Sequence, residues 1–403
     1  MKVLFVGLLY NPQKEEEYIN HSKIGISVAS NLYQWNTIRG LVANGIDVEV
    51  IGSIPYGCYP ELSDKAFVRD EFYLLDDIKL TQFGYINFYW IKHLFREYKI
   101  KAYIKKWVKK NQGDSCIVLF YDIQKIFLRI IQWLKIFKNV KSSIIVPDLA
   151  GELRNDVGIK GIKGWLLNKT AYGLLSSSSC ADSYILLTNQ MNDIVNTKSR
   201  PYTVIDGIVD DEKKVNIKVP NKRVIMYAGN LSSQYRISQL LSVFKETKND
   251  NLELWFCGKG DEEKNIVEAS KIDSRIKYLG FVSKKELEEI EKSVCFYINP
   301  RINNGEYTKY SFPSKNLEYL LAGKPVIAYK LDGMSEDYDD IFLYLSEDGD
   351  DSIKRMFRKL AEMSDDEIVE LSKMGAEFVK KHNGKKNQGL KVIKLFEGLF
   401  DEN

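Results

Sequence analysis

The residue best suited to bind a ligand is a single carboxylate in a short, otherwise apolar helical segment. Glu318 stands between Leu317 and Leu320, Gly323 suits the end of the helix, and Pro325 prevents its continuation into the apolar run that follows. A carboxylate at the edge of a parallel sheet can accept hydrogen bonds from two neighbouring hydroxyls, such as those of a ribose. The alternative interpretation is a Glu on the exposed side of the helix.

Glycines and cations stand where apolar runs of the second half end. Gly229 and Asn230 follow one run, and Gly258 follows another within a short glycine turn. A glycine lets backbone amides approach a phosphate closely, and a following helix N-terminus adds favourable dipole charge. A plain turn is the alternative at Gly258. Four basic residues are candidates to neutralise a diphosphate, and each has a solvated surface charge as its alternative: Arg236, Arg301, Lys309 and Lys315.

The first half offers a different set of polar residues. Asp148 follows an apolar run and is a candidate acid or base that faces an acceptor, with a helix-capping Asp as the alternative. Asn31, Gln34 and Trp35 suit sugar recognition by hydrogen bonding and ring stacking, and they also suit an ordinary helix start. The three histidines lack the spacing of a zinc site.

Short apolar runs of strand length recur in both halves of the chain. Most are uniformly apolar, which indicates strands buried on both faces of a parallel sheet. Helical patterns lie between them, and two of these begin with capping boxes at residues 283–286 and 364–367. The alternation predicts two doubly wound α/β domains. The predicted strands are residues 2–9, 48–54, 116–121, 143–146, 183–188, 223–228, 252–257, 276–279, 294–299, 325–329 and 341–345.

Composition is that of an ordinary globular protein, with 44% hydrophobic and 28% charged residues and a net charge of +3. The five cysteines are scattered and predict buried free thiols in a reducing compartment. No apolar run approaches the roughly 18–20 residues that span a bilayer. We therefore expect a cytoplasmic protein.

Charge is unevenly distributed along the chain. Residues 91–141 contain thirteen Lys/Arg against three acidic residues, whereas residues 331–370 contain fourteen acidic against four basic residues. Within residues 99–110 and 125–141, lysines alternate with aromatic and aliphatic side chains. A solvated helix over the core is one interpretation, and a helix lying on the anionic inner face of a cell membrane is the other. No nucleic-acid recognition motif accompanies these residues.

The segment from Tyr310 to Pro325 resembles the nucleotide-sugar signature of the GT-B glycosyltransferases, particularly glycosyltransferase family 4. In that signature a Glu-x7-Glu block precedes a Gly-x-Pro-Val strand. Glu318 matches the second Glu, whose family role is to bind the donor ribose, and Tyr310 replaces the first, which contacts the donor sugar. Asn230 and Tyr235 stand where the family usually has Arg and Lys.

The resemblance covers nearly the whole chain and implies further roles. Main-chain groups near Phe281 and Val282 would pair with the base, and those around Pro313, Ser314 and Lys315 would meet the phosphates. It implies two Rossmann-like domains facing a central cleft, with residues 1–210 binding the acceptor, residues 211–385 binding the donor, and residues 386–403 forming a helix that crosses back to the first domain.

The resemblance also implies a retaining hexosyltransferase. The donor would be a nucleotide sugar, with a UDP-sugar expected, and the acceptor a lipid-linked or oligosaccharide glycan for capsule or another bacterial surface polysaccharide. Asp148 and Arg236 would be catalytic, and no obligatory metal or other cofactor is expected. Two alternatives remain, a nucleotide-sugar epimerase on the same fold and a non-catalytic nucleotide-sugar-binding subunit of a partner enzyme.

Overall fold

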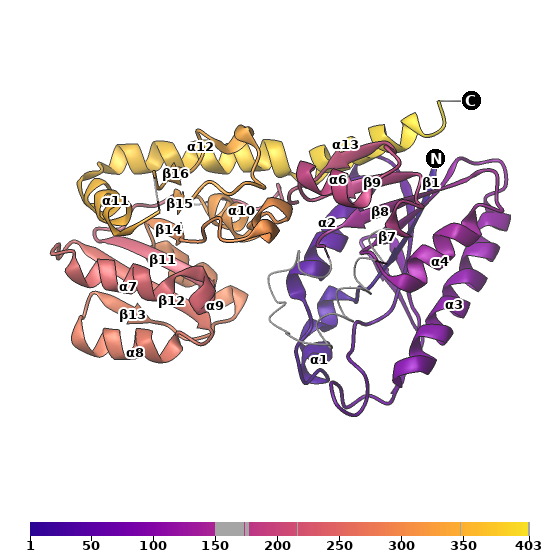
Figure 1. Ribbon diagram of the computed structural model, residues 1–403, viewed down its shortest axis with the longest axis horizontal. Coiled ribbons are helices and arrows are strands. Elements are labelled where there is room, and N and C mark those ends of the chain that lie inside the picture. Colours follow the sequence, from indigo (N-terminus) through magenta and orange to yellow (C-terminus); the bar gives the residue numbers. More distant parts are fainter. Residues whose placement is uncertain (150–172, 174–176, 216, 347, 402–403) are drawn as a thin grey trace. The chain divides into compact units, whose positions relative to one another are not determined.

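The computed structural model describes residues 1–149, 173, 177–215, 217–346 and 348–401 (Figure 1). It divides into two units. Unit 1 comprises Met1–Ile208 and Gly384–Asn403, and unit 2 comprises Val209–Asn383. The sequence had suggested divisions at residues 210 and 385.

Unit 1 is built on an eight-stranded sheet in which all neighbours are parallel except β4 and β5. A separate antiparallel pair is formed by β3 (Phe67–Val68) and β6 (Tyr85–Ile86). The central strands are fully buried and apolar, as expected for a sheet covered on both faces. In sheet order the strands are β10 (Tyr202–Val204), β9 (Ser183–Leu186), β8 (Val140–Val146), β7 (Cys116–Tyr121), β1 (Lys2–Gly7), β2 (Asp47–Gly52), β5 (Ile78–Gln82) and β4 (Glu71–Leu75).

The described helices of unit 1 include one from the end of the chain. α13 packs against α2 at a crossing of two glycines: a Cβ on Gly40 would lie 2.3 Å from the Lys385 carbonyl oxygen, and a Cβ on Gly389 would lie 2.3 Å from the Gly40 carbonyl oxygen. Only glycine permits the two backbones to approach this closely. The helices are α1 (Glu15–Asn20), α2 (Val28–Ala43), α3 (Tyr89–Lys110), α4 (Lys125–Leu134), α6 (Asn192–Val195) and α13 (Lys385–Gly398).

Unit 2 contains a six-stranded, fully parallel sheet. Two parallel sheets with intervening helices confirm the predicted α/β class with Rossmann-like domains. In sheet order the strands are β13 (Ile276–Tyr278), β12 (Leu252–Lys259), β11 (Arg223–Asn230), β14 (Phe296–Asn299), β15 (Val326–Ala328) and β16 (Leu343–Tyr344).

The helices of unit 2 bury apolar faces against this sheet. α7, α8 and α11 contribute to one continuous core with the strands, and α10 packs against α12. Both predicted capping boxes are present, since Ser283 and Ser364 each exchange hydrogen bonds with the Glu three residues later. The described helices are α7 (Ile237–Glu246), α8 (Glu263–Ile272), α9 (Lys284–Ile290), α10 (Ser314–Leu321), α11 (Asp350–Glu362) and α12 (Asp365–Asn383).

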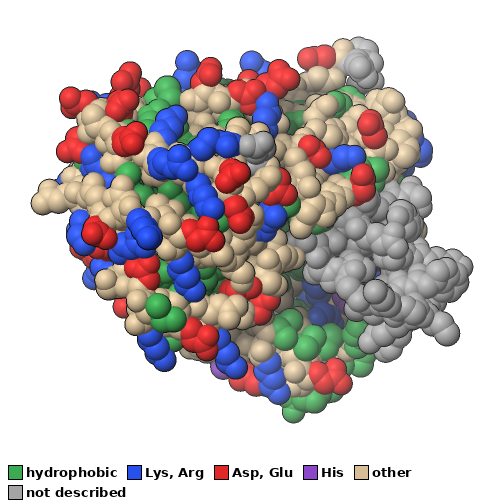
Figure 2. Space-filling model, turned by 60° about the vertical axis from the view of Figure 1, so that its left-hand side comes forward, with side chains coloured by type: hydrophobic (Ala, Val, Ile, Leu, Met, Phe, Trp, Pro, Cys, Tyr) green, Lys and Arg blue, Asp and Glu red, His purple; other side chains and the backbone are tan. Residues whose placement is uncertain are grey.

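Charged side chains of both signs cover the surface. On the face drawn in Figure 2, basic and acidic side chains are interspersed. Among the described residues, no helix combines the length and the apolar character needed to cross a membrane.

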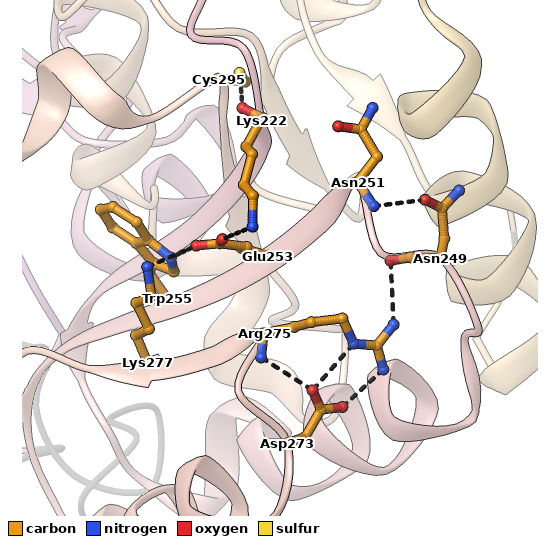
Figure 3. A network of polar contacts seen from close by, with 9 residues as sticks. All are labelled: Lys222, Asn249, Asn251, Glu253, Trp255, Asp273, Arg275, Lys277 and Cys295. Carbon is orange, nitrogen blue, oxygen red and sulfur yellow. Dashed lines mark hydrogen bonds and ion pairs between the residues drawn. The ribbon is translucent and has the colours of Figure 1, made fainter.

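A buried carboxylate organises the amino-terminal half of β12 (Figure 3). Glu253 accepts hydrogen bonds from Lys222 at 2.7 Å and from the Trp255 indole at 2.8 Å, and it pairs with Lys277 at 2.8 Å. Burial alone would raise the pKa of Glu253, but the three donors together outweigh it and lower the pKa to about 2. The cluster lies at the opposite end of the strand from Gly258, so we assign it to stability.

Candidate functional site

The carboxyl ends of β11 and β12 lie unusually close together. Gly229 and Gly258 are paired residues of the two strands, so both strands run further than the sequence predicted. Gly258 has a φ of +138°, and a Cβ atom on it would lie 1.8 Å from the Gly229 carbonyl oxygen. Its amide donates a hydrogen bond of 2.8 Å to the Gly280 carbonyl oxygen. The prediction of a glycine turn at Gly258 is therefore wrong, because the residue belongs to a strand that only glycine allows.

Lys315 brings a positive charge to this edge. Its Nζ lies 3.1 Å from the position of a Cβ on Gly229 and donates a 3.0 Å hydrogen bond to the Ala228 carbonyl oxygen. Lys315 as a whole is exposed. Burial lowers the pKa of its ammonium group, and the nearby Glu318 carboxylate opposes that effect. A desolvated ammonium beside a glycine edge is well placed to meet an anion.

Packing holds the helix that carries Lys315. The rings of Tyr319 on α10 and Tyr297 on β14 stack with centroids 3.8 Å apart, and the Tyr319 hydroxyl donates a 2.5 Å hydrogen bond to the Ala228 carbonyl oxygen. Asn299 at the end of β14 donates to the Asn316 side chain at 2.8 Å. These contacts fix the start of α10 against the ends of β11 and β14.

The other predicted residues of α10 surround this start. Pro313 is buried and precedes the helix, and Ser314 is its exposed first residue. Glu318 is exposed one turn after Lys315, and its charge acts on that ammonium. Glu318 therefore lies on the exposed side of α10, as in the alternative interpretation of this residue.

Arg301 adds a second cation near the same strands. Its Nη2 donates a 2.7 Å hydrogen bond to the Ser311 hydroxyl, whereas its buried Nε has no hydrogen-bond partner among the described residues. Arg301 also acts on Tyr227, whose pKa is raised by burial and lowered in part by the guanidinium. Because the Tyr227 hydroxyl lies 3.3 Å from the Cβ position of Gly229, Arg301 and Lys315 belong to one neighbourhood.

The remaining predicted donor residues lie around this edge. Asn230 ends β11 with its side chain exposed, and Tyr310 ends the short 3-10 helix η6 (Glu306–Tyr310) and is half-buried. Phe281 is 72% exposed. The Lys259 ammonium lies over the Phe281 ring, 5.4 Å from the ring centroid. The Val282 backbone interacts with the buried Cys257 thiol of β12.

Arg236 is already paired. It has a left-handed φ of +59°, which is rare outside glycine, and its guanidinium forms an ion pair with Asp348. An anion would have to compete with this carboxylate. The structure therefore favours Lys315 and Arg301 over Arg236 as the cations nearest the glycine edge.

In unit 1, Asp148 follows the carboxyl end of β8 and is exposed. Its carboxylate accepts a 2.9 Å hydrogen bond from the Leu149 amide. A second carboxylate, Asp122, follows the neighbouring strand β7 with a left-handed φ of +78°, and both carboxylates act on the Tyr121 hydroxyl. Sequence reasoning missed Asp122, although a polar residue directly after a uniformly apolar strand gave the same signal as Asp148.

The predicted acceptor residues on α2 are buried. The Asn31 side chain accepts a 3.0 Å hydrogen bond from the Tyr10 amide, and the Trp35 indole donates a 2.9 Å bond to the Tyr10 carbonyl oxygen. Gln34 donates to the Leu8 carbonyl oxygen at 3.0 Å. Asn31 and Trp35 thus tie α2 to the segment after β1, and their burial argues against the expected sugar contacts.

The amphipathic interpretation of the basic stretches also requires correction. Ile104, Trp107, Phe127 and Ile130 are all buried in the core of unit 1. The exposed apolar side chains lie earlier, in the first half of α3, where Leu94 and Tyr98 are 65% and 73% exposed. Two and three turns further along the same face stand the exposed lysines at positions 105 and 109.

Residues 209–379 match the protein family described as Glycosyl transferases group 1. Unit 2 is a group 1 glycosyltransferase domain. The prediction of a glycosyltransferase is thereby confirmed. No curated protein sequence matches the chain.

Solved structures similar to the whole chain have the GT-B fold. Sucrose-phosphate synthase from Thermosynechococcus elongatus is 14% identical with a TM-score of 0.67, and the alignment covers 100% of both chains. An E. coli structure described as trehalose-6-phosphate bound with UDP-2-fluoro glucose is 11% identical with a TM-score of 0.61, covering 98% and 99%. The lipopolysaccharide outer core galactosyltransferase WaaB is 17% identical with a TM-score of 0.58, covering 97% and 99%. At these identities the likeness establishes the fold.

Within the glycosyltransferase domain, the described side chains converge on one edge of the sheet. The structure brings Gly229, Gly258, Lys315 and Arg301 together, with Glu318 one turn away. The described residues contain no group of three or more His, Cys, Asp or Glu side chains placed to hold a metal ion.

Proposed function

We propose that the protein is a retaining glycosyltransferase that moves a hexosyl group from a UDP-sugar to a lipid-linked or oligosaccharide acceptor. The role would be in the synthesis of a bacterial surface polysaccharide, such as a capsule, on the cytoplasmic side of the membrane. The printed descriptions of two relatives support the parts of this proposal: one contains a UDP-sugar analogue, and the other is a galactosyltransferase of lipopolysaccharide.

The observation that carries the proposal is the position of the Lys315 ammonium, 3.1 Å from the Cβ position of Gly229 and hydrogen-bonded to the Ala228 carbonyl oxygen. In an open parallel sheet, ligands bind outside the carboxyl ends of the strands. There the diphosphate of a nucleotide sugar would meet Lys315, the free Nε of Arg301 and the amides that open α10. Glu318 would accept hydrogen bonds from the ribose hydroxyls.

Loss of the nucleoside diphosphate from the sugar leaves negative charge on the departing phosphate oxygens. Cations already fixed by packing stabilise that charge without reorganising during the reaction. Lys315 is fixed in this way through α10 and the stacked Tyr319. With two side-chain cations in this role, the proposal includes no obligatory metal. Asp148 would face the acceptor hydroxyl from unit 1.

We further propose that the first half of α3 and the lysines after it contact an anionic membrane surface. Leu94 and Tyr98 expose apolar surface, and Lys105 and Lys109 continue the same face. This arrangement suits an interfacial helix, in which apolar side chains enter the boundary layer and lysines approach anionic headgroups.

A thermal-shift screen of the purified protein against UDP, GDP, ADP and their common sugars tests donor binding first. A ligand that binds only the folded state raises its stability, so UDP and UDP-sugars should raise the midpoint. Release of UDP that depends on an added glycan acceptor would then establish transfer. Conversion of the sugar without an acceptor would indicate an epimerase, and binding without either reaction would indicate a non-catalytic subunit.

A further inference from the structure

Two cations are buried side by side in the first two turns of α3. Lys92 is 7% exposed and Arg96 is 5% exposed, and they stand four residues apart on one helix face. No acidic residue stands in the first turn of this helix. The helix dipole places partial positive charge at the same end, so it disfavours cations there.

The guanidinium of Arg96 lacks the hydrogen bonds that a buried charge requires. Its Nε and Nη2 are both buried and have no partner among the described residues. The centroid of the Tyr85 ring lies 5.9 Å from the guanidinium carbon. Lys92 donates to the Tyr56 carbonyl oxygen at 2.8 Å and lies 3.7 Å from the Cys58 sulfur.

The charged groups around this pair do not neutralise it. Burial lowers the pKa of Lys92, and it lowers that of Arg96 to about 10. Cys58 opposes this effect on Lys92, and Tyr85 opposes it on Arg96. His93 beside them has its pKa lowered by burial and by both cations. The nearby Glu97 carboxylate is held by Lys101 and Arg129.

Burying a guanidinium carries a large desolvation penalty, which destabilises the fold unless an anion compensates it. Nε and Nη2 form one edge of the guanidinium fork. Elsewhere in this chain the same edge holds a carboxylate, since Arg39 grips Asp76 and Arg275 grips Asp273 through these two atoms. In Arg96 neither atom of this edge has a hydrogen-bond partner among the described residues. This edge of an arginine binds carboxylates and phosphates in bidentate fashion.

The position in the fold also indicates a ligand. Tyr56 and Cys58 belong to the segment that follows the carboxyl end of β2, the side of a parallel sheet on which ligands bind. Asn87 closes this segment by donating to the Gly57 and Lys65 carbonyl oxygens at 2.8 and 2.9 Å. Its buried side-chain oxygen has no hydrogen-bond partner among the described residues. Unit 1 is also the unit to which we assign the acceptor.

We propose that Lys92 and Arg96 bind a phosphoryl group carried by the acceptor. That the ligand is an acceptor rests on the proposed transferase function. The anion site itself is argued only from residues of unit 1. Arg96 would hold two phosphate oxygens through Nε and Nη2, and Lys92 would contribute the second positive charge. The phosphoryl group could belong to a lipid-linked diphosphate or to a phosphorylated sugar.

Thermal unfolding of the full-length chain with inorganic phosphate, glucose 6-phosphate or farnesyl diphosphate tests the site. At least one of them should stabilise the wild type, with at least tenfold weaker apparent binding in both Arg96→Gln and Lys92→Gln. Lys106→Gln, which removes an exposed lysine of the same helix, should bind like the wild type. Whichever of the sugar phosphate and the isoprenoid diphosphate raises the midpoint more would identify the source of the phosphoryl group.

The proposal would be overturned if the ligands stabilised the wild type and both variants equally. It would also be overturned if no ligand stabilised the wild type. UDP binding serves as the separate readout for the donor site, because Arg96→Gln should leave it unchanged even if acceptor binding is lost. Arg96→Met provides a further check that does not require a ligand. Without phosphate, its midpoint should equal or exceed that of the wild type, whereas a structural arginine would leave it lower.

Discussion

The carbonyl oxygen of Gly229 occupies the place where Gly258 would carry a side chain. A Cβ there would approach the oxygen to 1.8 Å, and the φ of +138° is itself unfavourable for any other residue. Gly258→Ala should therefore destabilise unit 2 by at least about 1 kcal/mol and weaken nucleotide binding, because the strand ends must separate. Urea denaturation and UDP titration of the same sample measure both effects.

Gly398→Ala is a matched control for this substitution. Gly398 is the exposed last residue of α13, and a Cβ on it would meet nothing within 4 Å. Alanine there should be neutral or stabilising, since glycine costs about 1 kcal/mol relative to alanine inside a helix. Equal stability of the two variants would contradict the close approach at Gly258.

Glu318→Ala should weaken UDP binding at least tenfold while leaving the thermal midpoint near that of the wild type. The side chain is exposed, so its loss removes little packing. The ribose hydroxyls, however, would lose the carboxylate that accepts their hydrogen bonds. Isothermal titration with UDP and with UMP gives the affinities. Glu268→Ala, which removes an exposed carboxylate of α8, is the control. Unchanged affinity in Glu318→Ala would refute the assignment of the ribose site.

Glu253→Gln should lower the free energy of unfolding at neutral pH, by about 1–3 kcal/mol for a hydrogen-bonded charge. We expect the lower part of this range because Lys222 and Lys277 are largely exposed. The folded-state pKa of Glu253 is about 2, below its usual 4.5, so its contribution is present above pH 4.5 and is lost as the pH falls toward 2. Denaturant titrations at pH 7, 4 and 3 should show the difference between variant and wild type shrinking.

The double variant Leu94→Ser, Tyr98→Ser should reduce flotation of the protein with anionic liposomes. Lys105→Gln with Lys109→Gln should reduce it only at low salt, because headgroup attraction is screened. Phe72→Ser removes an equally exposed aromatic side chain, 73% exposed on β4, and should have no effect. Flotation that is absent in the wild type with both anionic and neutral vesicles would refute the membrane surface on α3.

The sequence was most informative about buried strands. The strand at Cys116–Tyr121 has the predicted bounds, because polar residues on both sides of a uniformly apolar run mark where it begins and ends. β11 and β12 extend beyond their predicted ends, since no propensity rule expects paired glycines to continue a strand. β3, β4, β5, β6 and β10 were not predicted. β3, β6 and β10 have too few residues to show a period, and β4 and β5 mix polar with apolar side chains.

Site residues were harder to predict because their roles depend on burial and on distant neighbours. Asn31 and Trp35 look like sugar-binding residues in sequence, but hydrogen bonds to Tyr10 use their polar atoms inside the core. Lys92 and Arg96 look like members of a solvated basic run, whereas both are buried. The tertiary fold decides between these readings, and local sequence does not contain that information.

The glycine crossing between α2 and α13 has a consequence for the order in which the chain folds. α13 is synthesised after unit 2, yet it completes the core of unit 1, where Val392, Ile393 and Phe396 join residues from β1 and β2. Domains usually fold as units while the chain emerges. Here unit 2 has its whole sequence available first, so the unit that starts the chain should be the last to reach its native state on the ribosome.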